Sequence, residues 1–419
     1  MYFYKDILHV DLEMSSLCNA KCPICNRRQQ GGPKNTSYKE TYLSLDRFKT
    51  WFDDEFVAQL FSMQMCGNYG DAMTNPELVD ILKYVRSVNP KIRFTMNTNA
   101  SGRNEEFWTE LGKLFSINDS TLTFSVDGLE DTNHIYRRGT HWPKIMNAMK
   151  WYIKAGGIAR WEFLVFKHNQ HQIEEARKLA NELGFWHFYA KEPLGFVNEP
   201  ITEDGRKYNS WMKVLNEKGA PDYFIEPKDP SMNSKEIKLY LKDTGFVKSE
   251  EQSIDPEELA KKFNDPKVFY QPRTEKVILN NKRKLSKWEK ELGETDIDCM
   301  VIKPKSVFIG HDGLVFPCCF TASKYYGNPN AFEVSQLQDF INSYGKRNIS
   351  LEYNSLKDII DGEMFQGRWV DSFNSHDIRE KRLITCSLFC GKKTNQEFMN
   401  TKNSIKHENN LIGKKDVLQ

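Results

Sequence analysis

Residues 7 to 190 alternate between short apolar runs and longer stretches in which apolar residues recur every three or four positions. The short runs are typical of strands, and the longer stretches are typical of amphipathic helices. The expected strands are Ile7–Glu13, Ser62–Cys66, Ile92–Asn97, Thr121–Val126, Trp161–Phe166 and Trp186–Tyr189. The expected helices are Leu45–Leu60, Pro76–Arg86, Glu105–Phe115, Trp142–Ala155 and Ile173–Leu183. This alternation predicts an α/β fold with a parallel sheet.

Six strands joined by helices form either a partial or full βα barrel or an open, doubly wound sheet. We expect a partial (β/α)6 TIM-like barrel. In both arrangements the active site lies at the carboxyl ends of the strands.

The pattern changes after residue 195, and 419 residues exceed what one hydrophobic core usually holds. We expect the barrel in 1–195, an inserted mixed-charge lobe in 196–296, a cysteine-containing domain in 297–395 and a tail in 396–419. Helices are expected in the lobe around Tyr208–Glu217, Pro256–Phe263 and Lys282–Leu292. The lobe either caps the barrel mouth and selects substrate or serves only for packing. In the third region, the Asp312-Gly313 pair between two apolar runs predicts a hairpin.

Composition narrows the choice of partners and cofactors. The net charge of +2, from 59 basic and 57 acidic residues, gives no electrostatic argument for nucleic acid or an anionic membrane surface. No run of 18 apolar residues occurs, and the apolar start is too short for a signal peptide, so we expect a cytoplasmic protein. Nine cysteines in a reducing compartment favour metal sites over disulfides. Because they fall into two groups, at 18–25 and 299–390, with Cys66 alone between them, we expect two metal sites.

The first group, Cys18, Cys22 and Cys25, has CX3CX2C spacing directly after the first expected strand. Thiolates are the ligands of iron–sulfur clusters, and three of them can hold three irons of a cubane while the fourth iron stays open to a cofactor. A zinc ion would need a fourth ligand, such as Cys66 or His9, to close its tetrahedron. A catalytic thiol is a further alternative.

This spacing and its position resemble the radical S-adenosylmethionine (SAM) superfamily, over residues 7 to 190 and again over 299 to 390. The resemblance implies that the open iron of a [4Fe–4S] cluster binds the amino and carboxylate groups of SAM. Reductive cleavage then gives a 5′-deoxyadenosyl radical that abstracts hydrogen from a substrate, while the protein orients and shields the cofactor. Ile24 stands where the family often has an aromatic residue, at a position that packs and does not ligate.

Further motifs after the second strand resemble the family's SAM-binding segments. The stretch from Cys66 to Leu78 is similar to its Gly-Gly-Glu-Pro segment, with Gly70-Asp71 in the place of Gly-Glu. The resemblance implies that Gly67, Gly70 and Asp71 bind the cofactor, because such backbone receives the methionyl amino group and glycine permits close approach. Asp71 and Ala72 depart from the family's Glu and Pro, and an ordinary βα turn is the alternative.

Short polar residues also follow the third and fourth strands. Thr98 and Asn99 resemble part of the family's Thr-Asn-Gly, and Ser125 and Asp127 resemble part of its Ser-x-Asp-Gly. The resemblance implies that these four residues contact the ribose hydroxyls and the methionyl carboxylate.

Two later positions each leave two interpretations open. The segment His134 to Gly139 resembles the family's His-x-x-x-Arg, which implies that Arg138 pairs with a carboxylate of the cofactor. A solvated surface arginine is the alternative. Asn169 follows the fifth strand, where it either contacts the cofactor or caps a helix.

The second group offers four separated thiols, at Cys299, Cys318, Cys386 and Cys390. Four thiolates saturate a [4Fe–4S] cluster or a zinc ion equally well. The spacing CX13GX4C followed by a cysteine pair resembles the twitch extension of radical SAM enzymes, a shortened SPASM domain, which implies one auxiliary [4Fe–4S] cluster. Cys319 could exchange roles with its neighbour Cys318.

Three functions fit these features. In the first, the auxiliary cluster aids a net oxidation, such as dehydrogenation or modification of a peptide or small molecule. In the second, the reaction is redox-neutral, such as an epimerisation or rearrangement, and the auxiliary cluster is an electron conduit. Both require an external reductant such as flavodoxin or ferredoxin. The third is a non-catalytic metal-binding scaffold. The sequence identifies neither the substrate nor an acid or base for catalysis.

Overall fold

The computed structural model describes residues 1–37, 39–191, 193, 212–228, 287–327, 332–378 and 381–392. The expected helix Pro256–Phe263 and the tail 396–419 lie outside these ranges. Within them, every helix is too short or too polar to cross a membrane.

A parallel sheet of six neighbouring strands forms the first part of the chain. In chain order these strands are β1 His9–Leu12, β2 Ser62–Met65, β3 Arg93–Thr98, β4 Thr121–Ser125, β5 Ala159–Leu164 and β6 His187–Lys191. Each pairs in parallel with the next, so the order in the sheet follows the order in the chain. The six predicted strands and the predicted partial βα barrel are therefore confirmed.

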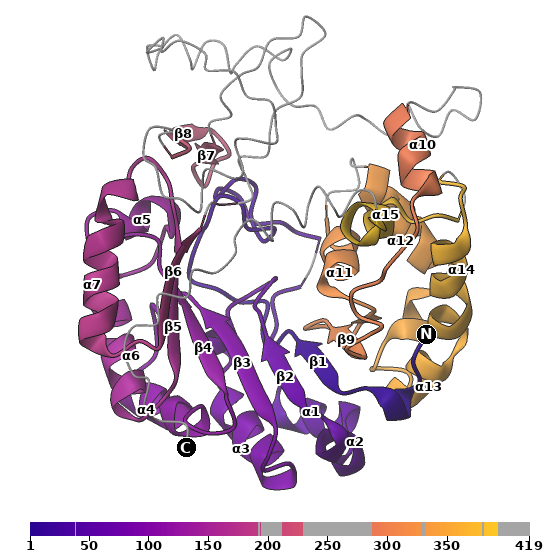
Figure 1. Cartoon of the computed structure of the whole chain (residues 1–419), viewed down its shortest axis with the longest axis horizontal. Coiled ribbons are helices and arrows are strands. Elements are labelled where there is room, and N and C mark those ends of the chain that lie inside the picture. The colour runs from indigo at the N-terminus through magenta and orange to yellow at the C-terminus, as the bar shows by residue number, and fades with distance from the viewer. Residues whose placement is uncertain are drawn as a thin grey trace, which may run out of the picture.

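Four of the predicted helices cover the outer face of this curved sheet (Figure 1). They are α3 Leu78–Val88, α4 Glu105–Leu114, α6 Trp142–Lys154 and α7 Ile173–Leu183. A short helix, α5 Asn133–Tyr136, precedes α6. The fully buried Trp108, Phe124 and Tyr152 pack between helices and strands, so the apolar positions that predicted the elements also form the core.

The predicted helix Leu45–Leu60 is wrong in one respect, because it is two helices. These are α1 Leu45–Trp51 and α2 Asp54–Gln59. Asp53 has extended backbone between them, and its carboxylate accepts a hydrogen bond from the Phe56 N–H at 2.7 Å. An N-cap of this kind begins a new helix, and it ends the first one where the periodicity alone shows no break.

The C-terminal region begins with a hairpin that extends the same sheet. Strand β9 Ser306–Ile309 pairs in parallel with β1, and β10 Val315–Phe316 returns antiparallel to β9. Gly313 has a φ of +80°, which the turn requires, so the predicted hairpin at Asp312-Gly313 is confirmed. The eight strands form one sheet in the order β10-β9-β1-β2-β3-β4-β5-β6.

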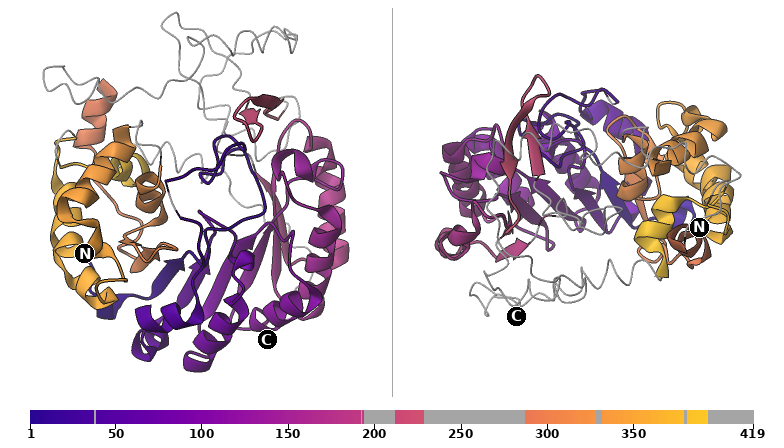
Figure 2. Two further views of the ribbon diagram at one scale, coloured as in Figure 1. Left: turned by 180° about the vertical axis from the view of Figure 1, so that it is seen from behind. Right: turned by 90° about the horizontal axis from the view of Figure 1, so that it is seen from above.

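Helices gather beside the β9 edge of the sheet, opposite the side that carries α7 (Figures 1 and 2). They are α10 Lys287–Glu294, α11 Cys319–Tyr325, α12 Phe332–Tyr344, α13 Leu356–Asp361, α14 Trp369–Asn374 and α15 Ile384–Cys390. A π-helical turn, Met364–Arg368, leads directly into α14.

A small hairpin packs on the cysteine loop that follows β1. Its strands are β7 Met212–Leu215 and β8 Pro221–Ile225. The helix predicted around Tyr208–Glu217 is therefore wrong for its described part. Asn216 accepts hydrogen bonds from the backbone of Lys218 and Ala220, which closes a turn where a helix would have continued.

Candidate functional site

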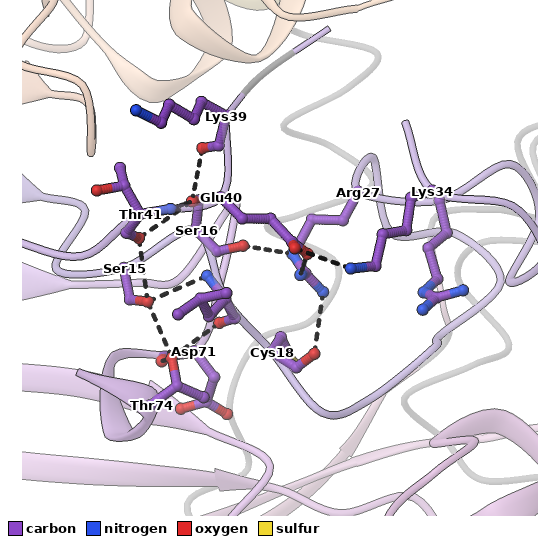
Figure 3. Close-up of polar contacts among 12 residues, drawn as sticks. Ser15, Ser16, Cys18, Arg27, Lys34, Lys39, Glu40, Thr41, Asp71 and Thr74 are labelled. Carbon is purple, nitrogen blue, oxygen red and sulfur yellow. Dashed lines mark hydrogen bonds and ion pairs between the residues drawn. The ribbon is translucent and has the colours of Figure 1, made fainter. Parts of the chain in front are cut away.

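The loop that carries Cys18, Cys22 and Cys25 is fixed by the loop after β2. The backbone N–H of Asp71 donates to the carbonyl of Leu17 at 2.8 Å, and the Thr74 hydroxyl donates to the same carbonyl at 2.9 Å (Figure 3). Gly70 lies so close to the Ser15 carbonyl that a Cβ would overlap it. The predicted glycine at this position is thus required for the two loops to pack together.

Asp71, in the loop after β2, forms one buried hydrogen-bond network with Thr98 and Asn99 at the end of β3. Its carboxylate accepts hydrogen bonds from the Thr98 hydroxyl at 3.1 Å, and from the backbone and side-chain nitrogens of Asn99 at 2.8 and 2.7 Å. Burial raises the pKa of Asp71, and these hydrogen bonds oppose the shift. The Asn99 amide also lies 3.5 Å from the sulfur of Cys18. The network therefore orients an amide toward the cysteine loop.

Asp127, beyond the end of β4, holds an arginine against the same loop. Its carboxylate is fully buried and pairs with Nε of Arg137 at 2.5 Å. Nη1 of Arg137 lies 3.8 Å from the sulfur of Cys22. The other carboxylate oxygen accepts the N–H of Leu164 at 2.7 Å, which ties the end of β5 to the site. Burial raises the pKa of Asp127, and the positive charge of Arg137 opposes that shift.

Arg138 has a different position from the one predicted for a cofactor contact. Its guanidinium pairs with Asp222 at 2.8 Å and donates to the carbonyl of Leu215 at 2.7 Å, both in the β7–β8 hairpin. Consecutive side chains point in different directions, so Arg137 and Arg138 have different partners. The guanidinium next to the cysteines belongs to Arg137 instead.

The remaining predicted positions lie at the carboxyl ends of the strands or in the loops that follow. Ser125 ends β4, and Gly67 has a φ of +71° in the loop after β2. Asn169 is fully buried, donates to the carbonyls of Asp127 and Leu164 at 2.9 Å and accepts the N–H of Phe166. Its side-chain bonds join two loops, and it is also the N-cap residue of the 3-10 helix Gln170–Gln172, without a side-chain capping bond.

Two buried charged residues at the site were not predicted. Arg27 donates to the carbonyls of Ser16 and Cys18 at 2.8 and 3.3 Å, and so closes the cysteine loop from within (Figure 3). Glu13 accepts the backbone N–H of Asn68 at 2.7 Å, and burial, followed by the charge of Asp11, raises the pKa of Glu13 to about 8. In the sequence, Arg27 and Glu13 are distinguished only by their positions beside the cysteine motif, and these positions do not show that the two side chains are buried.

The thiols of this loop lie in surroundings that favour the protonated form. Burial raises the pKa of all three thiols, that of Cys22 to about 11. Arg137 and Arg27 act in the opposite direction. Because metal ligands must be thiolates, an electropositive iron–sulfur core is the kind of partner that this group of sulfur atoms requires.

The four predicted auxiliary cysteines line a single cavity. Cys299 comes from the turn before β9, Cys318 is the N-cap of α11, and Cys386 and Cys390 lie one turn apart on α15. The rest of the lining is mostly apolar and consists of Pro317, Phe320, Thr321, Trp369, Phe373, Thr385 and Phe389. Cys319 is absent from this lining.

Cys319 instead lies near two carboxyl groups of the barrel interior. Burial raises the pKa of Cys319, and the nearby charges of Asp11 and Glu13 raise it further. The two adjacent cysteines thus serve different parts of the molecule, and Cys318 is the one at the cavity.

The spacing of the thiols differs from that of a mononuclear metal site. Across the described ranges, no three Cys, His, Asp or Glu side chains are close enough together to share one metal ion. A zinc ion draws four ligands to about 2.0–2.3 Å from one centre, whereas a cubane spreads its thiolates over separate irons. Both cysteine groups offer the thiol donors that an iron–sulfur cluster takes as ligands.

Contacts with α11 link the two groups. The side-chain amide of Asn26, next to Cys25, donates to the Ser323 hydroxyl at 3.0 Å. Asn35, further along the same loop, lies 3.5 Å from the carbonyl of Tyr326. Since Cys318 caps this helix, the first loop and the second cavity share one structural element.

The fold and the site together define a class. A curved parallel sheet carries a three-cysteine loop after its first strand, and buried polar residues lie at the carboxyl ends of the next three strands. These features define a partial βα barrel whose candidate site lies at the carboxyl ends of its strands. Residues 12–181 match the model of the radical SAM superfamily, and this part of the chain belongs to that superfamily. The match implies SAM and one [4Fe–4S] cluster as the cofactors of this part of the chain.

Several solved structures are similar to this chain. One is Streptococcus suis SuiB bound to S-adenosylmethionine, with 14% identity and a TM-score of 0.43, over 80% of this chain and 65% of that one. Another is anSMEcpe with bound AdoMet, with 14% identity and a TM-score of 0.47, over 95% of this chain and 93% of that one. The chain thus spans just under two thirds of the length of SuiB. No curated protein matches it.

Proposed function

We propose that the protein is a two-cluster radical SAM enzyme that oxidises a small molecule or a peptide. Cys18, Cys22 and Cys25 hold the cluster at which SAM is cleaved, and Cys299, Cys318, Cys386 and Cys390 hold an auxiliary [4Fe–4S] cluster. The observation that carries the proposal is that four cysteines, separated by up to 91 positions in the sequence, line one cavity and leave Cys319 outside it.

When bound, the first cluster supplies the electron that generates a carbon-centred radical from SAM. The chain's own residues orient and shield it. Arg137, held by Asp127, lies against Cys22 and favours its thiolate. Asn99, held by Asp71, donates toward Cys18. Arg27 fixes the backbone of the loop from inside.

The proposed SAM-binding residues divide into two kinds. The Asp71 carboxylate already accepts hydrogen bonds from Thr98 and Asn99, so we assign it to positioning those two residues. Gly67, Gly70 and Ser125 provide backbone and a hydroxyl at the ends of the strands. We assign to Arg137, and not to Arg138, the pairing with a carboxylate of the cofactor, because Arg137 is the arginine beside Cys22.

The second site suits electron transfer, which we assign to the oxidation of the substrate. Four thiols saturate a cubane and leave no iron open for a substrate, which suits electron transfer. The chain contributes a mostly apolar cavity around these thiols. In its wall, the rings of Phe320 and Phe389 stack with their centroids 4.1 Å apart. SuiB and anSMEcpe have been solved with bound peptides, and for this chain peptides and small molecules are both to be tested.

The initiating step can be tested without a substrate. Anaerobically reconstituted protein is incubated with SAM and dithionite, and 5′-deoxyadenosine and methionine are measured by liquid chromatography. We expect both products from the wild type and from the matched control Cys66→Ala, and neither from Cys22→Ala. Failure of the wild type to release either product would contradict the proposed function.

A further inference from the structure

Two residues that line the four-cysteine cavity carry a buried polar group without a hydrogen-bond partner among the described residues. The indole nitrogen of Trp369 and the hydroxyl of Thr385 are both buried, at 1% and 2% exposure, and neither has a hydrogen-bond partner among the described residues. Buried N–H and O–H groups are almost always hydrogen-bonded, so each unpaired one calls for an explanation. Both residues line the same cavity as the cysteines.

Different elements bring these two groups to the cavity. Trp369 is the first residue of α14 and follows the π-helical turn Met364–Arg368 directly. A wider turn of this kind changes the direction of the side chains after it, and such turns are frequent at functional sites. The Trp369 ring packs against Phe340, with centroids 4.8 Å apart. Thr385 lies on α15 immediately before the ligand Cys386.

The third polar side chain of the lining differs from these two. The hydroxyl of Thr321 donates to the carbonyl of Cys318 at 2.8 Å, so its hydrogen is already used. The rings of Phe320, Phe373 and Phe389 offer no lone pair. Besides the hydroxyl oxygens of Thr321 and Thr385, the cysteine sulfur atoms are the side-chain acceptors that the cavity lining offers to an unpaired donor.

We propose that the Trp369 N–H and the Thr385 O–H donate hydrogen bonds to the sulfur atoms of the auxiliary cluster and raise its reduction potential. The inference rests on the auxiliary cluster of the proposed function. A reduced cluster carries one more negative charge than the oxidised form, so donors to its sulfurs stabilise the reduced form more. The cavity would then make its cluster a better electron acceptor, which is what a substrate oxidation requires.

The experiment isolates the second site in the full-length chain. In a Cys18→Ala/Cys22→Ala/Cys25→Ala background, the auxiliary cluster is reconstituted, its iron is counted, and its potential is measured by a redox titration followed by electron paramagnetic resonance. Thr385→Val and Trp369→Phe each remove one donor. Thr385→Ser keeps the hydroxyl, and Phe373→Leu changes the volume of the same lining without removing a donor.

We expect a lower midpoint potential in Thr385→Val and in Trp369→Phe, and a larger decrease in the double variant. Thr385→Ser and Phe373→Leu should titrate close to the background protein. Full iron with the same potential in all variants would overturn the inference alone. Background protein without iron would overturn the auxiliary cluster and the inference with it.

Discussion

The two cysteine sites differ in the atoms around their sulfurs. At the Cys18–Cys25 loop, an arginine and an amide reach the sulfurs, Arg137 at 3.8 Å from Cys22 and Asn99 at 3.5 Å from Cys18. Buried carboxylates hold both groups in place. Besides its cysteines, the four-cysteine cavity is lined by four aromatic residues, one proline and two threonines, and none of its lining residues is an acid, a lysine or an arginine.

Under the proposed function, this difference in surroundings suits two different tasks, cofactor binding at the first site and electron transfer at the second. A cluster with three protein ligands must also receive a polar cofactor, and fixed polar groups at the ends of the strands suit that purpose. A cluster with four protein ligands has only to exchange electrons, and an apolar wall controls its potential through burial and hydrogen bonds. Both sites contact α11, so the two tasks are served by neighbouring parts of one fold.

The largest effect is expected at the adjacent thiols of Cys318 and Cys319, at the start of α11. Cys318→Ala should remove the auxiliary cluster and about half of the iron per chain, because a cubane needs a thiolate on each iron that SAM does not occupy. Cys319→Ala, the matched control, should keep full iron because its thiol lies outside the cavity. The measurement is the iron content of the two reconstituted variants. Loss of iron in Cys319→Ala and full iron in Cys318→Ala would show that Cys319, and not Cys318, is the cluster ligand.

The next effect concerns the charged wall of the first site. Arg137→Met leaves the fully buried Asp127 carboxylate unpaired, which should cost about 3–5 kcal/mol of folding free energy. Arg138→Met breaks a more exposed pair with Asp222 and should cost about 1 kcal/mol or less. Urea unfolding of both variants under the same conditions compares them. Equal losses of folding free energy in the two variants would contradict a larger contribution of the buried Arg137–Asp127 pair to stability.

A smaller effect is expected from the backbone that supports the first loop. Gly70→Ala places a methyl group against the Ser15 carbonyl, which should cost about 1–3 kcal/mol and lower the yield of 5′-deoxyadenosine. In Gly102→Ala, the new methyl meets only the flexible end of Met73 at 3.4 Å, so stability should stay within about 1 kcal/mol of the wild type. Identical behaviour of the two variants would argue against close packing at Gly70.

The last effect is a dependence of stability on pH that arises at Glu13 in the first region. The pKa of Glu13 is raised from 4.5 to about 8 in the folded chain, so the folded state binds the proton more tightly than the unfolded state. The contribution of Glu13 to stability is therefore present at pH 4 and declines as the pH rises toward 8, by at most about 1.4 kcal/mol per pH unit. Unfolding of the wild type and Glu13→Gln between pH 5 and 8 should show a flatter slope for the variant. Parallel slopes would contradict the shift.

The sequence predicted the barrel because its strands and helices have clear and different periods. It missed the break at Asp53, since a helix cap depends on one backbone conformation that the apolar pattern does not show. It also read the segment around Val214 as a helix, whereas burial against the cysteine loop makes it a strand. Local patterns carry little information about such contacts between distant segments.

At the candidate site, the spacing of the cysteines in the sequence was enough to predict the two cysteine groups. The grouping of the four distant cysteines in one cavity agrees with the motif. The choice between Arg137 and Arg138 depends on side-chain direction, and the burial of Arg27 and Glu13 depends on the folded loop. The unpaired donors of Trp369 and Thr385 belong to no motif, because an unsatisfied group exists only in a three-dimensional structure.

The most direct test of two separate clusters is the iron content of two full-length variants after the same anaerobic reconstitution. One lacks Cys18, Cys22 and Cys25, and the other lacks Cys299, Cys318, Cys386 and Cys390, each replaced by alanine. The account predicts about four irons per chain in each variant and about eight in the wild type. Iron near zero in the variant that lacks only the first three cysteines would contradict it.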